Sequence, residues 1–252
     1  MSSSLNANSL NAKRTIIENA YLATIDAAAT EHSRGHLVIE GEHIVAVGAG
    51  KAPNHLREGA TFVDATGCLV TPGLINTHHH LYQWLTRGYA QDAILFDWLT
   101  ALYPLWSRID ADLTGSGALG AMAVLARSGC TTVGDHHYIF PARSGDIVGA
   151  IVEAAGRIGV RLHATRGSMD LGASKGGLPP DFAVETTSAA LEASAEAVER
   201  YHDPAPEAMV KVAIAPCSPF SVTADLLREA AVLARDLGVR LHTHASETVE
   251  ED

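Results

Sequence analysis

Three consecutive histidines, His78, His79 and His80, close an apolar run that begins near Leu69. On a β-strand, side chains two residues apart share a face, so His78 and His80 point one way and His79 points the other. Two imidazoles at this spacing can both reach one ion at the ~2.0–2.1 Å of a zinc–nitrogen bond. The spacing predicts that His78 and His80 bind a metal and that His79 is structural.

A second histidine pair lies in the segment LHTHASE, residues 241–247. His242 and His244 again share a strand face, but only His244 stands at the end of the strand, so we predict that His242 is structural. Glu247 follows in a loop where its carboxylate can reach a water molecule beside the ion. Three neutral nitrogens on one ion, next to a carboxylate that is not a ligand, are one way to build a hydrolytic site. The two clusters together predict three metal ligands, His78, His80 and His244.

The first part of the chain, which must lead into these histidines, is rich in short β segments. From Arg14 to Val70 these segments alternate with turns, and Gly41-Glu42 marks a tight hairpin. We predict a small antiparallel β unit over residues 14–70. Residues 1–13 are mostly polar and are expected to form a flexible tail.

In residues 71–252, apolar strands alternate with helices, with five strands and four helices visible. This order is typical of βαβ units and a parallel sheet, which can be a (β/α)8 barrel or an open doubly wound sheet. An open sheet that binds dinucleotides has a Gly-rich turn after its first strand, whereas here that strand ends in histidines. Polar side chains recur where successive strands end, as they do at the active face of a barrel. We therefore predict an α/β fold of the (β/α)8 TIM-barrel type.

The composition excludes several classes of function. A net charge of -11 argues against nucleic acid or an anionic membrane as a partner. Three scattered cysteines imply no disulfide framework and fit a reducing cytosol. The chain shows no secretory signal and no apolar run near the ~20 residues that cross a bilayer. We expect a cytoplasmic protein that acts on a small molecule.

The motifs PGLINTHHHL and LHTHASE resemble the metal-binding motifs of the amidohydrolase superfamily. The resemblance implies a (β/α)8 barrel that holds a divalent metal, with residues 14–70 forming the N-terminal part of a small β-sandwich. It assigns His78 and His80 as first-strand ligands, His244 as the fifth-strand ligand and Glu247 as the general acid/base of a His-x-x-Glu motif. The family's further histidine and aspartate would lie beyond Asp252. We therefore expect about the first five strands of the barrel, in an incomplete copy that is inactive alone.

Further segments, SGCTTVGDHHYIFP, TRGSMDLGASKGGLPPD and IAPCSPFSVT, resemble the branch of the superfamily that contains 8-oxoguanine deaminase and hydroxydechloroatrazine ethylaminohydrolase. The resemblance implies hydrolysis of 8-oxoguanine to urate and ammonia, with zinc as the favoured metal and iron tolerated by the same ligands. It leaves open a homo-oligomer for the complete enzyme. Two alternatives stay open, a related amidohydrolase acting on triazine or other purine and pyrimidine rings, and a non-catalytic truncated relative.

Four residues are candidate substrate contacts. Gln83 could offer its amide to a purine edge or merely solvate a loop, and Trp84 could stack on a base or simply pack. Arg166 ends the third predicted strand, where it could meet a ring carbonyl or form a salt bridge. His136 and His137 end the second strand on opposite faces, so at most one of them faces the site. We take His136 as that residue.

Overall fold

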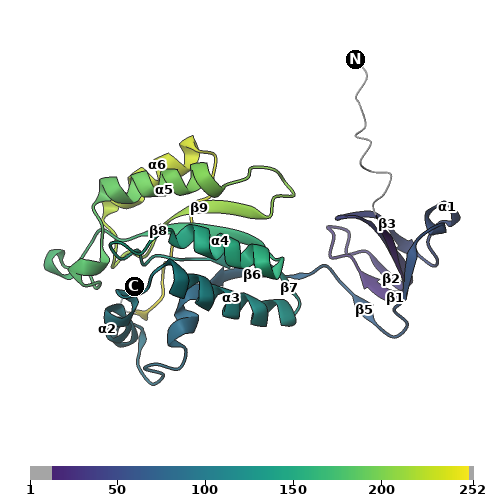
Figure 1. Ribbon diagram of the computed structural model, residues 1–252, viewed down its shortest axis with the longest axis horizontal. Helices are drawn as coiled ribbons and strands as arrows, with labels where there is room; N and C mark the ends of the chain where they lie inside the picture. Colours follow the sequence, from purple (N-terminus) through teal and green to yellow (C-terminus); the bar gives the residue numbers. More distant parts are fainter. Residues whose placement is uncertain (1–12, 250–252) are drawn as a thin grey trace, which may run out of the picture. The chain divides into compact units, whose positions relative to one another are not determined.

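The computed structural model describes residues 13–249, which form two compact units, one ending at Pro72 and the other beginning at Gly73 (Figure 1). Of the tail expected over residues 1–13, all but Lys13 lies outside the described residues. Within the described part of the chain, no helix is long and apolar enough to cross a membrane.

The first unit is a mixed β-sheet of order β3-β2-β1-β4, with β5 paired to β1. Its elements are β1 (Arg14–Ala23), β2 (Glu31–Glu40), β3 (His43–Ala49), α1 (Asn54–Arg57), β4 (Thr61–Asp64) and β5 (Leu69–Val70). The hairpin predicted at Gly41 joins β2 and β3, and Gly41 has the positive φ of 58° that such a turn requires.

The prediction of a wholly antiparallel first unit is wrong, because β4 and β5 both pair parallel to β1. Parallel pairing needs a crossover connection, and α1 with its flanking turns provides it between β3 and β4. One hydrophobic core of the first unit is formed by the buried residues Ile16, Val38 and Ala52.

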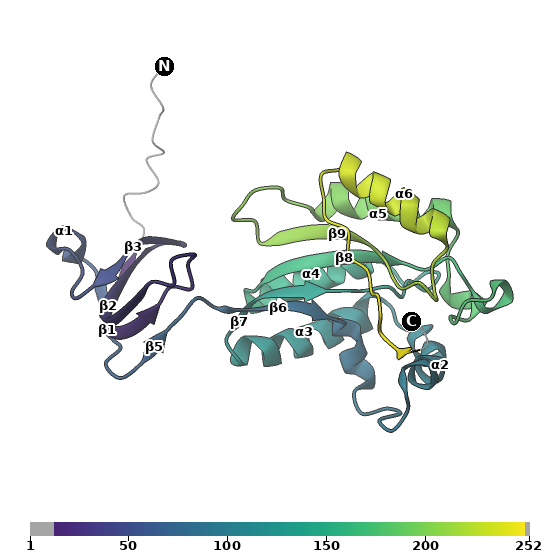
Figure 2. The ribbon, with the colours of Figure 1, turned by 180° about the vertical axis from the view of Figure 1, so that it is seen from behind.

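The second unit is a parallel sheet of order β6-β7-β8-β9. Its strands are β6 (Leu74–His79), β7 (Cys130–Asp135), β8 (Arg161–Ser168) and β9 (Val210–Pro216). The helices that connect and cover them are α3 (Ala111–Arg127), α4 (Ile147–Ile158), α5 (Thr187–Tyr201) and α6 (Ala224–Asp236). Figures 1 and 2 show these four helices on one face of the sheet. A doubly wound sheet has helices on both faces, so this arrangement confirms the barrel-type fold.

Two connections of the second unit carry additional structure. After β6 the chain forms the 3₁₀ helix η2 (Leu81–Thr86) and then α2 (Leu95–Trp106), which the sequence did not predict. The Gly- and Pro-rich loop after β8 contains the short 3₁₀ turns η3 (Ala173–Lys175) and η4 (Asp181–Ala183). Both connections extend from the carboxyl ends of the strands, where a barrel builds its site.

The fifth predicted strand, residues 239–247, is shorter than expected. Only Leu241 pairs with β9, in a single parallel bridge to Ile214. The amide of Ile214 donates to the carbonyl of Arg240 (3.1 Å), and the amide of His242 donates to Ile214 (2.9 Å). Farther on, the amide of His244 donates to the carbonyl of Cys217 (2.9 Å), so the segment stays beside the end of β9.

Each of the four covering helices begins with a polar residue whose side chain accepts a hydrogen bond from a main-chain amide of the first turn. These N-caps are Asp110, Asp146, Thr186 and Thr223. Such caps satisfy amides that have no partner within the helix, and each stabilises its helix by roughly 1 kcal/mol. The caps fix where each helix begins, immediately after the loops that line the carboxyl edge of the sheet.

Asp170 ties the starts of two of these helices together. Its carboxylate is buried and accepts hydrogen bonds from the amide and the hydroxyl of Thr223, both at 2.7 Å, and from the hydroxyl of Thr187 at 2.7 Å. The carboxylate thereby joins the loop after β8 to the beginnings of α5 and α6. Removing this carboxylate would leave the hydroxyl of Thr187 and the amide and hydroxyl of Thr223 without their acceptor.

We expect Asp170→Asn to lower the free energy of unfolding by about 2–3 kcal/mol, because an amide nitrogen would face the donors that now meet a carboxylate. Urea unfolding followed by tryptophan fluorescence measures this, since Trp84, Trp98 and Trp106 all lie in the second unit. Asp225→Asn is the matched control, because Asp225 is exposed and its ion pair is with the equally exposed Arg228 of the next turn. Equal stability of both variants would contradict the role of Asp170.

Candidate metal centre

Three histidine nitrogens converge at the carboxyl end of β6. The Nε2 atoms of His78, His80 and His244 form a triangle in which every side measures 3.2 Å. Two nitrogens bound to one tetrahedral zinc at ~2.0–2.1 Å are separated by roughly 3.3 Å. The triangle therefore has the dimensions of three ligands around one ion.

The remaining ring nitrogens show which protons these histidines carry. Nδ1 of His80 donates to the carbonyl of His136 (2.5 Å), and Nδ1 of His244 donates to the carbonyl of Cys217 (2.8 Å). A carbonyl can only accept, so both rings carry their proton on Nδ1 and turn the Nε2 lone pair toward the triangle. Lone pairs that face one another repel unless a cation lies between them. The donor set therefore fits a divalent metal ion.

Burial favours the neutral form of His78 and His80, the form in which a histidine binds a metal. It lowers the pKa of His80 to about 3 and also lowers the pKa of His78, where the neighbouring His244 adds to the effect. Burial likewise lowers the pKa of His242 to about 4. At neutral pH each of these rings has a lone pair to offer.

A cavity of about 180 Å³ opens beside the triangle. Its polar wall holds His80, His244, Gln83 and Glu247, and Glu247 accepts a 2.7 Å hydrogen bond from the buried hydroxyl of Ser218. The rest of the wall is largely apolar and aromatic: Leu95, Trp98, Leu99, Tyr103, Tyr138, Cys217 and Phe220. A flat, ring-shaped molecule with a few polar edges suits such a cavity.

A larger cavity of about 520 Å³ lies elsewhere, between the loop after β7 and α5. Arginine and carboxylate side chains alternate around it, among them Arg166, Glu185 and Arg200. No histidine lines it, so size alone does not identify the candidate site.

The sequence model of the amidohydrolase family matches residues 69–252, which include every residue of the metal triangle. This chain belongs to the amidohydrolase family. The match confirms the resemblance drawn from PGLINTHHHL and LHTHASE.

Two curated relatives lie in the branch expected for this amidohydrolase. It is 42% identical over 244 residues to 8-oxoguanine deaminase of Pseudomonas aeruginosa, a match that covers 95% of this chain and 53% of the relative. It is 39% identical over 196 residues to hydroxydechloroatrazine ethylaminohydrolase of Pseudomonas sp., covering 76% of this chain and 41% of the relative. The chain thus spans about half the length of the curated relatives it matches.

Solved structures agree on the fold. Atrazine chlorohydrolase of Arthrobacter aurescens, crystallised with zinc, aligns with a TM-score of 0.84 at 31% identity, over 93% of this chain and 53% of that one. Guanine deaminase of C. acetobutylicum, with bound guanine, aligns with a TM-score of 0.78 over 95% of this chain and 54% of that one. Its identity of 19% shows the shared fold alone.

The structure brings two of the four predicted substrate contacts of this amidohydrolase to the metal triangle. Gln83 lines the small cavity and donates a 3.3 Å hydrogen bond to the hydroxyl of Tyr138. His136 is fully buried and stacks on His244, with ring centroids 4.2 Å apart. His137 faces away, and its Nε2 bonds to the carbonyl of Ile139 (2.7 Å).

Trp84 and Arg166 lie outside the small cavity, contrary to expectation. Trp84 packs on α3, and the guanidinium of Arg87 lies over its ring. The tryptophan that lines the small cavity is Trp98. Arg166 is 5% exposed and makes two 2.8 Å hydrogen bonds to Glu185, so its guanidinium is already paired. A substrate contact by Trp84 or Arg166 therefore stays a prediction that the geometry of the small cavity does not support.

Sequence reasoning missed Ser218. This residue comes just after β9, so the rule that barrel sites gather at strand ends could have found it. Asp135, the last residue of β7, accepts a 2.8 Å hydrogen bond from the amide of Leu81 and so holds the first turn of η2. Burial raises the pKa of Asp135 to about 7, an effect that the Leu81 hydrogen bond opposes.

We predict that His244→Ala weakens zinc binding by more than ~100-fold, because one of three converging ligands is lost. Competition with a chromogenic chelator measures the dissociation constant, and circular dichroism checks that the variant is folded. His55→Ala, which removes an exposed histidine of the first unit, should leave zinc binding unchanged. Tight zinc binding by folded His244→Ala would contradict the assignment.

In the metal-free chain, stability should fall as the pH is lowered from 7 to 5. Burial lowers the pKa of His80 and His137 to about 3 and that of His136 even further, whereas unfolded histidines titrate near ~6.5. The unfolded chain then binds more protons, which favours unfolding at acid pH. The raised pKa of Asp135 acts in the opposite sense, because between ~4 and 7 the folded state holds its proton. The net loss near pH 5 should be on the order of 2 kcal/mol per pH unit.

Urea unfolding at pH 7, 6 and 5 with a chelator present checks this dependence. Asp135→Asn provides the control, since it keeps an acceptor for Leu81 but removes the opposing proton. The variant should lose stability more steeply toward pH 5. Constant stability across this range would show that the buried histidines do not govern the acid response.

Proposed function

We propose that this chain carries three metal ligands of a hydrolytic deaminase that acts on an amino-substituted heterocycle. The favoured substrate is 8-oxoguanine, and the products are urate and ammonia. One observation carries the proposal: three Nε2 atoms 3.2 Å apart stand beside a cavity that also holds a carboxylate. The similarity to 8-oxoguanine deaminase supports the reaction type. So does the similarity to isoxanthopterin deaminase, 39% identical over 217 residues.

His78, His80 and His244 would hold the ion, and three imidazoles favour zinc, although iron accepts the same ligands. A divalent ion bound there supplies an activated water molecule as the nucleophile near neutral pH. His80 and His244 hold their Nδ1 protons against main-chain carbonyls, so neither ring has a proton on Nε2 that would compete with the ion. The related atrazine chlorohydrolase was crystallised with zinc.

Glu247 would move the protons. Ser218 donates to one of its carboxylate oxygens and so directs the group within the cavity wall. In a deamination, Glu247 would accept one proton from the attacking water and pass it to a ring nitrogen. As the carbonyl forms, Glu247 would take up the second proton of that water and deliver it to the amine, which leaves as ammonia. Proton transfer by a positioned carboxylate is expected to contribute ~10²–10⁴-fold to the rate.

The cavity walls would select a flat ring. Gln83 donates to Tyr138, which leaves its Oε1 free of that bond to accept from a ring N–H or an amino group. Trp98 and Phe220 offer aromatic faces and exclude water from the reacting carbon. A purine-sized base, carrying donors on one edge, matches this combination better than a nucleoside would in about 180 Å³.

Ammonia release from a panel of purines, pyrimidines and triazines tests the proposal. The zinc-loaded chain is assayed alone and also joined to the second half of the P. aeruginosa deaminase. We predict release from 8-oxoguanine by the joined protein and a ~10²–10⁴-fold loss in Glu247→Gln, with zinc binding retained. A preference for triazine rings would instead favour the branch represented by hydroxydechloroatrazine ethylaminohydrolase. A folded, zinc-loaded joined protein that releases ammonia from none of the rings would overturn the proposal.

A further inference from the structure

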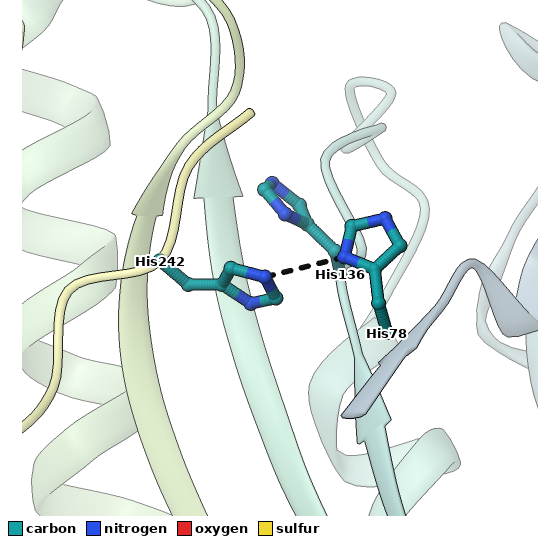
Figure 3. Close-up of side chains that lie close together, drawn as sticks. All are labelled: His78, His136 and His242. Carbon is teal, nitrogen blue, oxygen red and sulfur yellow. Dashed lines mark hydrogen bonds between the residues drawn. The ribbon is translucent and has the colours of Figure 1, made fainter. Parts of the chain in front are cut away.

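We propose that His242 is a positioning residue of the metal centre, whose Nε2 accepts a hydrogen bond from Nδ1 of His78 and so turns Nε2 of His78 toward the ion. The inference rests on the metal site of the proposed function. Figure 3 shows the contact, in which Nδ1 of His78 and Nε2 of His242 are 3.2 Å apart. The two rings are nearly perpendicular, with an interplanar angle of 81°, so the edge of one ring points toward the other.

His78 needs such a partner more than the other two ligands do. The rings of His80 and His244 are oriented by main-chain carbonyls, whose acceptor role is fixed. Within residues 13–249, Nδ1 of His78 has one hydrogen-bond partner, and that partner is the ring of His242. His78 is also the exposed member of the triangle, so packing restrains it least.

The place of His242 is fixed by the main chain and by its ring neighbours. Its amide donates to the carbonyl of Ile214 (2.9 Å), directly after the bridge between Leu241 and Ile214. On its other side lies the ring of His136, with centroids 4.7 Å apart. His136 is fully buried and packs between His242 and His244, which limits the movement of both. His242 can therefore hold a steady acceptor in front of His78.

A ligand role for His242 is the main alternative. Nitrogens of His78, His136 and His242 lie within 4.8 Å of one another, which is a looser group than the 3.2 Å triangle of Nε2 atoms. The nitrogen of His78 that contacts His242 is Nδ1, whereas its Nε2 belongs to that triangle. While Nδ1 of His78 donates to His242, it cannot bind an ion as well. The geometry thus favours orientation of His78 over a second ion.

Zinc affinity of His242 variants in the full 252-residue chain tests the role. His242→Leu fills similar space without an acceptor, and it should weaken zinc binding by ~10–100-fold, as the loss of an orienting partner does at other metal sites. His242→Gln can reach Nδ1 of His78 with its side-chain oxygen and should restore binding to within a few-fold of the original. His242→Asn is polar but one methylene shorter, so it should resemble His242→Leu. All variants should bind one zinc per chain.

A second measurement reports on His78 itself. In ¹⁵N-histidine-labelled, zinc-loaded protein, the His78 ring should carry its proton on Nδ1, and its signals are identified by their absence in His78→Gln. His242→Gln should keep this tautomer, which a purely structural role for His242 would not require. Circular dichroism confirms the fold of each variant. If His242→Leu does not fold, the zinc affinities of His242→Gln and His242→Asn still distinguish a positioning role of His242 from a purely structural one.

The outcomes separate the inference from the proposed function. If the original chain binds no zinc, the metal site of the proposed function fails. If it binds zinc and the Leu, Gln and Asn variants bind equally well, only the positioning role of His242 is overturned. Two zinc ions in the original chain and one in His242→Leu would show that His242 is a ligand, which also overturns the positioning role.

Discussion

The candidate metal centre depends on three imidazole nitrogens that face one another 3.2 Å apart, and those of His80 and His244 carry no proton. His80 and His244 are locked in this state because their other nitrogens donate to carbonyls. Three lone pairs directed at one point are repulsive without a cation and attractive with one, and the partial burial of the group strengthens both effects. A positive ion is therefore the partner that this arrangement requires, and the surrounding structure serves to keep the lone pairs aligned.

The main chain of the parallel sheet supplies two of the three orienting groups. The carbonyl of His136 lies just after β7, and the carbonyl of Cys217 just after β9. Strand ends meet at one edge of a parallel sheet, so strand register decides which carbonyl faces which ring. Capped helices and the buried carboxylate of Asp170 hold the loops at this edge. Orientation of His80 and His244 thus follows from the fold itself, independently of the neighbouring side chains.

The sequence predicted the features that depend on strand periodicity. The two-residue period of a strand places His78 and His80 together whatever surrounds them, and alternation of strands and helices predicts the parallel sheet. Trp84 shows where such reasoning stops. In the 3₁₀ helix η2, neighbouring residues point about 120° apart, so Gln83 can reach the cavity while Trp84 packs on α3.

Long-range pairing explains the other differences from expectation. Glu185, which forms the ion pair with Arg166, lies in a loop 19 residues away, and no local sequence pattern predicts this pair. The same holds for the parallel pairing of β4 with β1, which depends on the path of the chain through α1. Polar side chains at strand ends are thus easily predicted as candidates, but the choice among them depends on contacts made only in the folded state.

The proposed ligands come from opposite ends of the second unit, with His80 and His244 separated by 164 residues. Residues 239–247 pair with the sheet at the bridge of Leu241, and their main-chain bonds at the sheet edge go to Ile214 and Cys217, so they hold His244 beside β9 and not beside β6. An ion that binds only when these segments are together stabilises their association by its own binding free energy, about 2.7 kcal/mol at a concentration 100-fold above the dissociation constant. Docking of the segment and assembly of the ligand triangle are therefore one equilibrium. A metal held by His78, His80 and His244 would therefore also link β6 to the segment that follows α6.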